Sequence, residues 1–249
     1  MKVSVIIPAA GLGTRMSRAA AEPAGKPALA GRKQFLLLDG EPILAHTVRK
    51  FMAAPSVSEV VIALRPEDRE WARELLARVD KTKPVRFADG GDSRQQSVEN
   101  ALAILDHDTD LVAVHDAVRP FVSVQTIEHV IAEASIHGAA IVGVVPVDTV
   151  KQVHLNHIRG TIRRDRLILA QTPQVFRFDL LRQAFDRARA DQFIATDESS
   201  LVERLEQVEV RVVPGSDRNI KITKPGDLEL ARLYLAQEKA DSPAQQDAG

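Results

Sequence analysis

Short apolar runs rich in Val, Ile and Leu alternate with amphipathic segments along the first two thirds of the chain. Residues 3–8, 57–64, 85–88, 111–115 and 139–145 are the expected strands. Between them, apolar residues such as Ile43, Leu44, Val48 and Phe51 recur at helical spacing. Nearly continuous apolar strands separated by helices are typical of a parallel sheet that is buried on both faces. The pattern therefore predicts an α/β fold with a doubly wound, mostly parallel, Rossmann-like sheet and helices on both faces.

The composition limits the partners of such a domain. The chain has 249 residues, with 33 Lys plus Arg against 34 Asp plus Glu. This balance gives no basic excess for nucleic acid or an anionic membrane, so neither is expected as a partner. With Cys 0, disulfides and thiolate zinc sites are excluded. We expect a single domain over residues 1–239, a disordered tail over 240–249 and a cytoplasmic location, since the first apolar run is too short for a membrane.

A β-hairpin interrupts the βα alternation. Residues 150–155 and 158–163 alternate in polarity around a short turn at Asn156-His157. A hairpin with so few apolar residues needs a surface to pack on. We therefore predict a projecting arm over residues 148–167, with a second subunit as its packing partner.

The first loop follows directly after the first strand, with the sequence Pro8-Ala9-Ala10-Gly11-Leu12-Gly13-Thr14-Arg15. Glycines there allow close approach of a ligand, and successive N–H groups can form an anion-binding nest. Arg15 beside such a nest suits phosphate. The loop is neither a dinucleotide fingerprint, because Met16 stands in place of the third glycine, nor a Walker A loop.

A long Ala-, Gly- and Pro-rich stretch separates Arg15 from Lys33. It has little to bury and is expected to form a lid. Lys33 is a candidate phosphate ligand at the hinge of that lid, and Lys26 is a rival lysine within it.

Two further strand ends carry polar motifs. Gly90-Gly91 is followed by Asp92 and Ser93, which read either as a helix-capping turn or as backbone that recognises a base edge. Asp116 follows another strand, where it could hold Mg²⁺ on nucleotide phosphates or cap the next helix. His115 points to the opposite face and is expected to be packed or hydrogen-bonded.

Taken together, these motifs resemble the 2-C-methyl-D-erythritol 4-phosphate cytidylyltransferase family of the non-mevalonate isoprenoid pathway. The resemblance runs in order from Val3 to about Tyr234. It is carried by residues 8–16, 33–35, 90–98, 114–120, 147–151, 171–174, 196–199 and 219–221. The chain departs from the family in a longer stretch before Lys33 and in Arg32, where the family carries proline.

The resemblance implies an enzyme that joins CTP to methylerythritol phosphate, with Mg²⁺ as cofactor, and a homodimer with exchanged arms. The implied CTP-binding residues are Ala9, Ala10, Gly11, Gly13, Gly91, Asp92 and Ser97. Arg15 and Lys33 would be catalytic, and Asp116 would bind the metal. The implied acceptor site consists of Asp116, Ala117, Arg119, Thr149, Arg164, Thr196 and Lys221. Thr149 and Arg164 would come from the neighbouring subunit, although Arg163 and Arg166 lie beside Arg164 and leave that choice open.

Two other functions remain as alternatives. Ribitol 5-phosphate cytidylyltransferases resemble this family in fold and motifs, but Pro8-Ala9-Ala10 and residues 219–223 favour methylerythritol phosphate as the acceptor. A non-catalytic nucleotide-sensing domain would be expected to lack charge at Arg15, Lys33 or Asp116, and all three are present.

Overall fold

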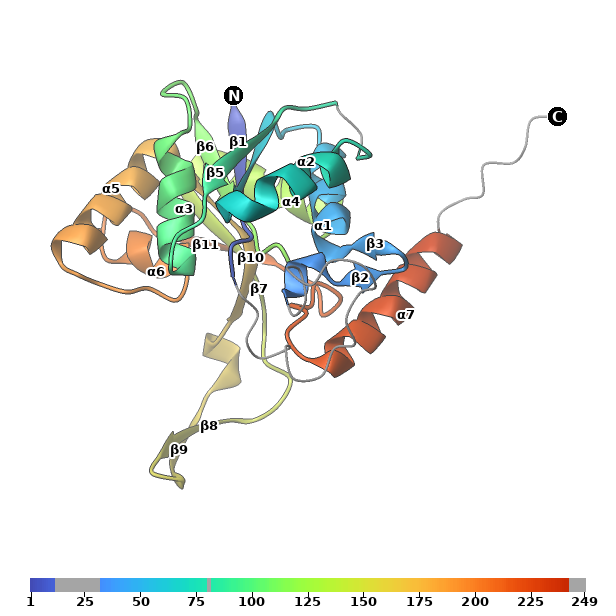
Figure 1. Cartoon of the computed structure of the whole chain (residues 1–249). Coiled ribbons are helices and arrows are strands. Elements are labelled where there is room, and N and C mark those ends of the chain that lie inside the picture. Colours follow the sequence, from blue (N-terminus) through green and yellow to red (C-terminus); the bar gives the residue numbers. More distant parts are fainter. Residues whose placement is uncertain (12–31, 80–81, 242–249) are drawn as a thin grey trace.

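A mixed sheet forms the centre of the protein in a computed structural model, which describes residues 1–11, 32–79 and 82–241 (Figure 1). In the described residues this sheet has seven strands. In spatial order they are β11 (Arg211–Pro214), β7 (Ala139–Val144), β10 (Leu169–Arg177), β6 (Leu111–Val114), β1 (Val3–Pro8), β4 (Glu59–Leu64) and β5 (Val85–Asp89). All neighbouring pairs are parallel except the two that β10 makes. The predicted doubly wound, mostly parallel sheet is confirmed.

Helices cover both faces of the sheet. One face packs against α1 (Ile43–Met52), α2 (Arg69–Leu76) and α4 (Val124–His137). The other face packs against α3 (Arg94–Ala103), α5 (Phe178–Ala190) and α6 (Glu198–Glu203). Strand β1 shows that both faces of the sheet are buried. Val5 and Ile7 pack in the apolar core on one face, while Ile6 between them packs in the core on the other. This burial on both faces explains the continuous apolar runs in the sequence.

Strand β10 was not among the strands expected from the sequence. It pairs antiparallel with β6 and β7, and its register with β7 shifts between Ala170 and Gln174. Pro173 lies in this irregular stretch, and a proline inside a run normally argues against a central strand. The shift lets the sheet accept the proline and places Thr172 beside the end of β6.

The chain ends its described part in a long helix, α7 (Pro225–Asp241). Its buried residues Ala231 and Leu235 pack with Leu38 and Phe121 in a third apolar cluster. Leu38 belongs to a small hairpin of β2 (Leu37–Leu38) and β3 (Glu41–Pro42). The helix includes residues 240 and 241, which were expected to belong to the disordered tail, and residues 242–249 lie outside the described part of the chain.

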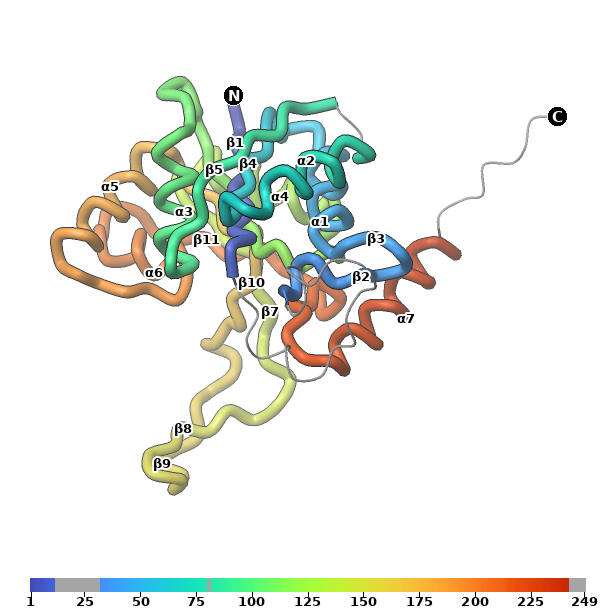
Figure 2. The backbone as a smooth tube through the Cα atoms, viewed as in Figure 1, coloured from blue at the N-terminus to red at the C-terminus, as the bar shows by residue number. Residues whose placement is uncertain are grey.

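The predicted arm projects away from the sheet as the hairpin of β8 (Val150–His154) and β9 (His157–Ile162) (Figure 2). A short 3₁₀ turn, η4 (Arg164–Arg166), leads back from it towards β10. His154 pairs with His157, so the turn residues are Leu155 and Asn156 rather than the expected Asn156 and His157. Both have positive φ, 46° and 63°, as a two-residue hairpin turn requires. Among the residues that the structure describes, none of the helices combines the length and the apolar character that a membrane span needs.

Candidate active site

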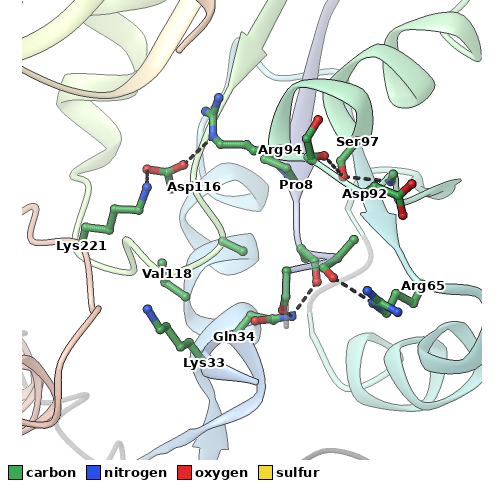
Figure 3. Close-up of a pocket in the computed structure, with 16 residues that line it drawn as sticks. Pro8, Lys33, Gln34, Arg65, Asp92, Arg94, Ser97, Asp116, Val118 and Lys221 are labelled. Carbon is green, nitrogen blue, oxygen red and sulfur yellow. Dashed lines mark hydrogen bonds and ion pairs between the residues drawn. The ribbon is translucent and has the colours of Figure 1, made fainter. Parts of the chain in front are cut away.

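A cavity of about 430 Å³ opens at the carboxyl ends of β1, β4, β5 and β6 (Figure 3). This is the edge at which open α/β sheets bind their ligands. The cavity brings together ten of the residues predicted from the sequence. They are Ala9, Ala10, Gly11, Lys33, Gly91, Asp92, Ser97, Asp116, Ala117 and Lys221. The same wall includes Pro8, Gln34, Arg65, Ser93, Arg94 and Val118, which the sequence reasoning had not assigned to a site.

The loop after β5 forms one side of the cavity. Ser93, rather than Asp92, caps α3, because its hydroxyl accepts from the amide of Gln96 at 3.0 Å. The amide of Gly91 donates to the hydroxyl of Ser97 at 3.0 Å, which closes the loop on the first turn of the helix. The carboxylate of Asp92 is therefore left at the cavity wall instead of being used as a cap.

The first loop and the loop after β5 touch each other. A Cβ atom added at Gly90 would lie 2.1 Å from the Cβ of Ala10 and 3.2 Å from the backbone carbon of Leu64. No side chain fits in that space. Glycine at this position is thus explained by close backbone approach between two loops that line one cavity.

Asp116 holds three cations at the other side of the cavity. Its Oδ1 lies 3.1 Å from Nε of Arg94, and its Oδ2 lies 3.2 Å from Nε of Arg119 and 3.0 Å from Nζ of Lys221. Burial opposes ionisation of this carboxyl, but the charges of the three cations outweigh it and hold the pKa of Asp116 well below its usual range. Asp116 is therefore a carboxylate at neutral pH. It does not serve as a helix cap, since α4 is capped by Ser123.

Arg94 also makes a second ion pair that the sequence analysis missed. Its Nη1 donates to both carboxylate oxygens of Glu198, at 2.7 and 2.9 Å, and the Glu198 side chain is 1% exposed. Burial raises the pKa of Glu198, and the charge of Arg94 works against that rise. Arg94 lies in the motif of residues 90–98 and Glu198 in the motif of residues 196–199. Each is in the first turn of a helix, where a charged side chain usually faces solvent. Only the fold shows that these turns, from α3 and α6, meet.

His115 packs behind the cavity, as expected. Its ring is fully buried, with Nε2 donating to the carbonyl of Arg119 at 3.0 Å and Nδ1 at 3.1 Å from the hydroxyl of Thr172. That hydroxyl also accepts from the amide of Asp116 at 3.1 Å. Burial lowers the pKa of His115 to about 4, so the ring is neutral at neutral pH. Its role is to fix the turn that carries Asp116.

The other predicted residues that the structure describes are not in the wall of this cavity. Arg119 is not in its wall, but it contacts Asp116 and donates to the carbonyl of Asn219 at 2.7 Å. Thr196 is exposed just before α6. Thr149 and Arg164 lie at the base of the arm, where Arg164 donates to the carbonyl of Val147. Gly13, Arg15 and Lys26 lie outside the described residues.

Among the described residues, two carboxylates line the cavity, those of Asp92 and Asp116. In the described part of the chain, no three His, Asp or Glu side chains gather as a metal site. A cation in this cavity would therefore depend on Asp116, Asp92 or both, and on oxygens of a bound substrate. That donor set suits Mg²⁺, which commonly takes one or two carboxylates together with substrate phosphates.

Known proteins share both the sequence and the fold. The sequence pattern of the 2-C-methyl-D-erythritol 4-phosphate cytidylyltransferase (IspD) family matches residues 3–237. The chain belongs to this family. It is similar to the cytidylyltransferase of that name from Solibacter usitatus, with 60% identity over 97% of this chain and 99% of the relative. The enzyme of that name from Acidobacterium capsulatum is 49% identical over 96% of this chain and its own full length.

Solved structures of cytidylyltransferases agree with the sequence relatives. The 4-diphosphocytidyl-2C-methyl-D-erythritol synthase of Anaerococcus prevotii has a TM-score of 0.81, with 28% identity over 94% of this chain and 96% of that chain. The cytidylyltransferase of Francisella tularensis has a TM-score of 0.75, with 34% identity over 94% and 99%. The cavity described above is thus carried on a fold that other members share.

Removing the Arg94 side chain should destabilise the fold because Glu198 would be left buried without its cation. We expect Arg94→Gln to lower the free energy of unfolding by about 3–5 kcal/mol, measured by urea denaturation at neutral pH. Arg189→Gln is the matched control, since Arg189 pairs with Glu99 on the exposed side of α3 and its loss should change stability little. Equal losses in the two variants would show that the Arg94 pair is no more than a surface contact.

Proposed function

We propose that this protein transfers CMP from CTP to 2-C-methyl-D-erythritol 4-phosphate, giving 4-diphosphocytidyl-2-C-methyl-D-erythritol and pyrophosphate. The observation that carries the proposal is one cavity lined both by the two glycine-containing loops and by the cations around Asp116. The loops suit a nucleotide, and the cations suit the phosphate of an acceptor. Membership of the family supplies the identity of the two substrates.

The chemistry needs alignment and charge neutralisation rather than a base. An oxygen of the acceptor phosphate attacks the α-phosphorus of CTP, and the bond from that phosphorus to the bridging β-phosphate oxygen breaks. Pyrophosphate leaves with the electron pair of that bond. Because the acceptor phosphate is already an anion, no proton has to be removed, and the obstacle is the repulsion between two anions. Lys33 at the cavity wall and Arg15 in the first loop would offset the charge on the α-phosphate.

Asp116 and the triphosphate of CTP would hold Mg²⁺. The depressed pKa keeps Asp116 ionised. Arg119 and Lys221 contact its Oδ2, while Oδ1 accepts from Arg94 and keeps a lone pair for a metal. When bound, Mg²⁺ would supply further neutralisation of phosphate charge. Lys221, which contacts Asp116 and lines the cavity, would bind the acceptor phosphate together with Arg119.

The cytoplasmic location stays a prediction from the sequence.

Pyrophosphate release tests the function directly. Purified protein with Mg²⁺, CTP and methylerythritol phosphate should release pyrophosphate, while UTP or ATP in place of CTP should release little. Turnover with ribitol 5-phosphate instead would keep the mechanism and overturn the acceptor. Binding of CTP without any release would favour the nucleotide-sensing alternative.

Lys33 should act mainly in the transition state. We expect Lys33→Ala to lower kcat by about 10²–10³-fold, the loss typical of one oxyanion-stabilising group, with a much smaller change in CTP affinity. Steady-state kinetics and calorimetric CTP binding measure the two effects. Lys50→Ala is the control, because Lys50 pairs with Glu238 away from the cavity. Equal losses in turnover and affinity would contradict a transition-state role.

The arm is proposed to join two subunits, so that Thr149 and Arg164 of one subunit reach the cavity of the other. Large apolar side chains are exposed along the arm and its base. They are Val145, Val147, Val153, Leu155, Ile158, Ile162, Ile168 and Leu169. Exposed apolar surface of this extent on a projecting hairpin favours a protein partner, and an exchanged arm of a second copy would cover it.

Charge placed on the arm should separate the subunits. Val153 and Ile158 are paired across β8 and β9 and are 56% and 66% exposed, so Val153→Glu with Ile158→Glu would put two carboxylates into the proposed interface. Light scattering should give a dimer mass for the wild type and a monomer mass for the double variant. Ile136→Glu, at a residue 72% exposed on α4, should leave the mass unchanged. A monomeric wild type would refute the arm exchange.

A further inference from the structure

Two side chains donate hydrogen bonds to three consecutive backbone carbonyls of the first loop. Nε2 of Gln34 donates to the carbonyl oxygens of Ala9 at 2.6 Å and Gly11 at 3.1 Å. Nε of Arg65 donates to the carbonyl oxygen of Ala10, between them, at 3.1 Å. The Gln34 side chain and its bond to Ala9 are buried, so water competes little there, and the other two bonds are partly buried. Figure 3 shows the two side chains reaching the loop from different segments.

These contacts orient the peptide groups at the start of the loop, from Ala9 to Gly11. In a planar trans peptide the N–H points opposite to the C=O. Because the carbonyls of Ala9 and Ala10 face Gln34 and Arg65, the N–H groups of Ala10 and Gly11 point away from these donors. Gln34 and Arg65 therefore determine which way the loop presents its amides, and amides that point at a phosphate or a base are what a nucleotide loop needs.

Gln34 also connects that loop to Lys33, its neighbour in the short 3₁₀ helix η2 (Lys33–Phe35). This helix is held on both sides of Gln34. The ring of Phe35 packs edge-on against that of Trp71, with 4.5 Å between the ring centroids. On the other side, Arg32 forms ion pairs with Asp68 and Glu67. Because η2 is fixed, the two bonds from Gln34 set the position of the loop relative to Lys33.

We propose that Gln34 is a positioning residue, which holds the first loop and the Lys33 segment in one arrangement through its bonds to the carbonyls of Ala9 and Gly11. It acts through the loop and needs no contact with the reacting atoms. The inference rests on the proposed function, since the arrangement matters only if CTP and Lys33 meet in this cavity. Loss of the Gln34 donors should therefore weaken CTP binding and lower turnover together.

Two substitutions separate the donors of Gln34 from its volume. Gln34→Met keeps a side chain of similar length without any donor. The loss of two hydrogen bonds predicts roughly a tenfold or larger fall in kcat/KM for CTP at every pH. Gln34→Glu is nearly the same shape, but its ionised form places oxygens against two carbonyl oxygens. The fall in kcat/KM for CTP of Gln34→Glu should be larger at high pH than at low pH, because the ionised side chain has no donor.

Protonation should partly restore Gln34→Glu, because a carboxyl group regains one O–H donor. Burial and the two carbonyls raise the pKa of such a carboxyl, while the cations of Lys33 and Arg65 nearby lower it. The other charged groups of the cavity wall, Asp92, Arg94, Asp116 and Lys221, are common to wild type and variants. The activity of each variant is therefore taken as a ratio to the wild type at the same pH.

The experiment measures CTP-dependent pyrophosphate release and calorimetric CTP binding between about pH 8.5 and about pH 5.5. The ratio for Gln34→Glu should rise as the pH falls, while the ratio for Gln34→Met stays low and flat. Gln207→Glu and Gln207→Met, at an exposed glutamine that bonds Gln183, should match the wild type throughout. Thermal unfolding checks that each variant is folded.

Either of two results would overturn the inference. A Gln34→Met protein within about twofold of the wild type would show that the loop keeps its arrangement without the donors. A Gln34→Glu ratio close to one throughout, although its ionised form has no donor, would show that Gln34 serves another purpose. A wild type that releases no pyrophosphate would instead refute the proposed function, and CTP binding by the variants would still test whether Gln34 shapes the loop.

Discussion

The carboxylate of Asp116 is the constraint on which the cavity depends. It is 6% exposed and accepts from Arg94, Arg119 and Lys221, which come from α3, from the turn after β6 and from the segment after β11. Three cations this close would repel one another in a weakly screened interior. The single negative charge between them, with Glu198 behind Arg94, makes their approach favourable. Segments far apart in the sequence are thereby brought to one wall, and the wall keeps a net positive charge for an anionic ligand.

The same cluster is continuous with the nucleotide loops. Arg94 is the first residue of α3, and the loop from Gly91 to Ser93 is closed on the first turn of that helix. The first loop touches Gly90 and is held from behind by Gln34 and Arg65. The two loops, which suit a nucleotide, are therefore linked to the cations around Asp116, which suit a phosphate acceptor. A shift of one group would displace the other. Such rigidity fits a reaction whose catalysis consists of alignment and charge neutralisation.

Much of this fold could be predicted because its strands are buried on both faces. Continuous apolar runs marked β1, β4, β6 and β7, and the partly buried edge strand β5 was marked by Val85, Phe87 and Ala88. The loops after β1, β5 and β6 were correctly expected at one edge. Strand β10 escaped because Pro173 interrupts its pattern, and the register shift that accommodates the proline is a property of the sheet. Arg94 and Glu198 escaped because their partnership joins residues 104 positions apart, and each alone resembles an ordinary helix-start charge. The roles proposed for Thr149 and Arg164 would need a second subunit, so the fold of one chain does not test them.

The central claim is that Asp116 makes the acceptor site by placing its cations, and binding to Asp116→Asn tests it most directly. Calorimetry would compare methylerythritol phosphate binding to the wild type and to this variant, both saturated with an unreactive CTP analogue. If the carboxylate positions Arg119 and Lys221, the variant should bind the acceptor about tenfold or more weakly, although it carries one negative charge fewer. Tighter binding by Asp116→Asn would contradict the account, because Asp116 would then only reduce the attraction between the cations and the phosphate.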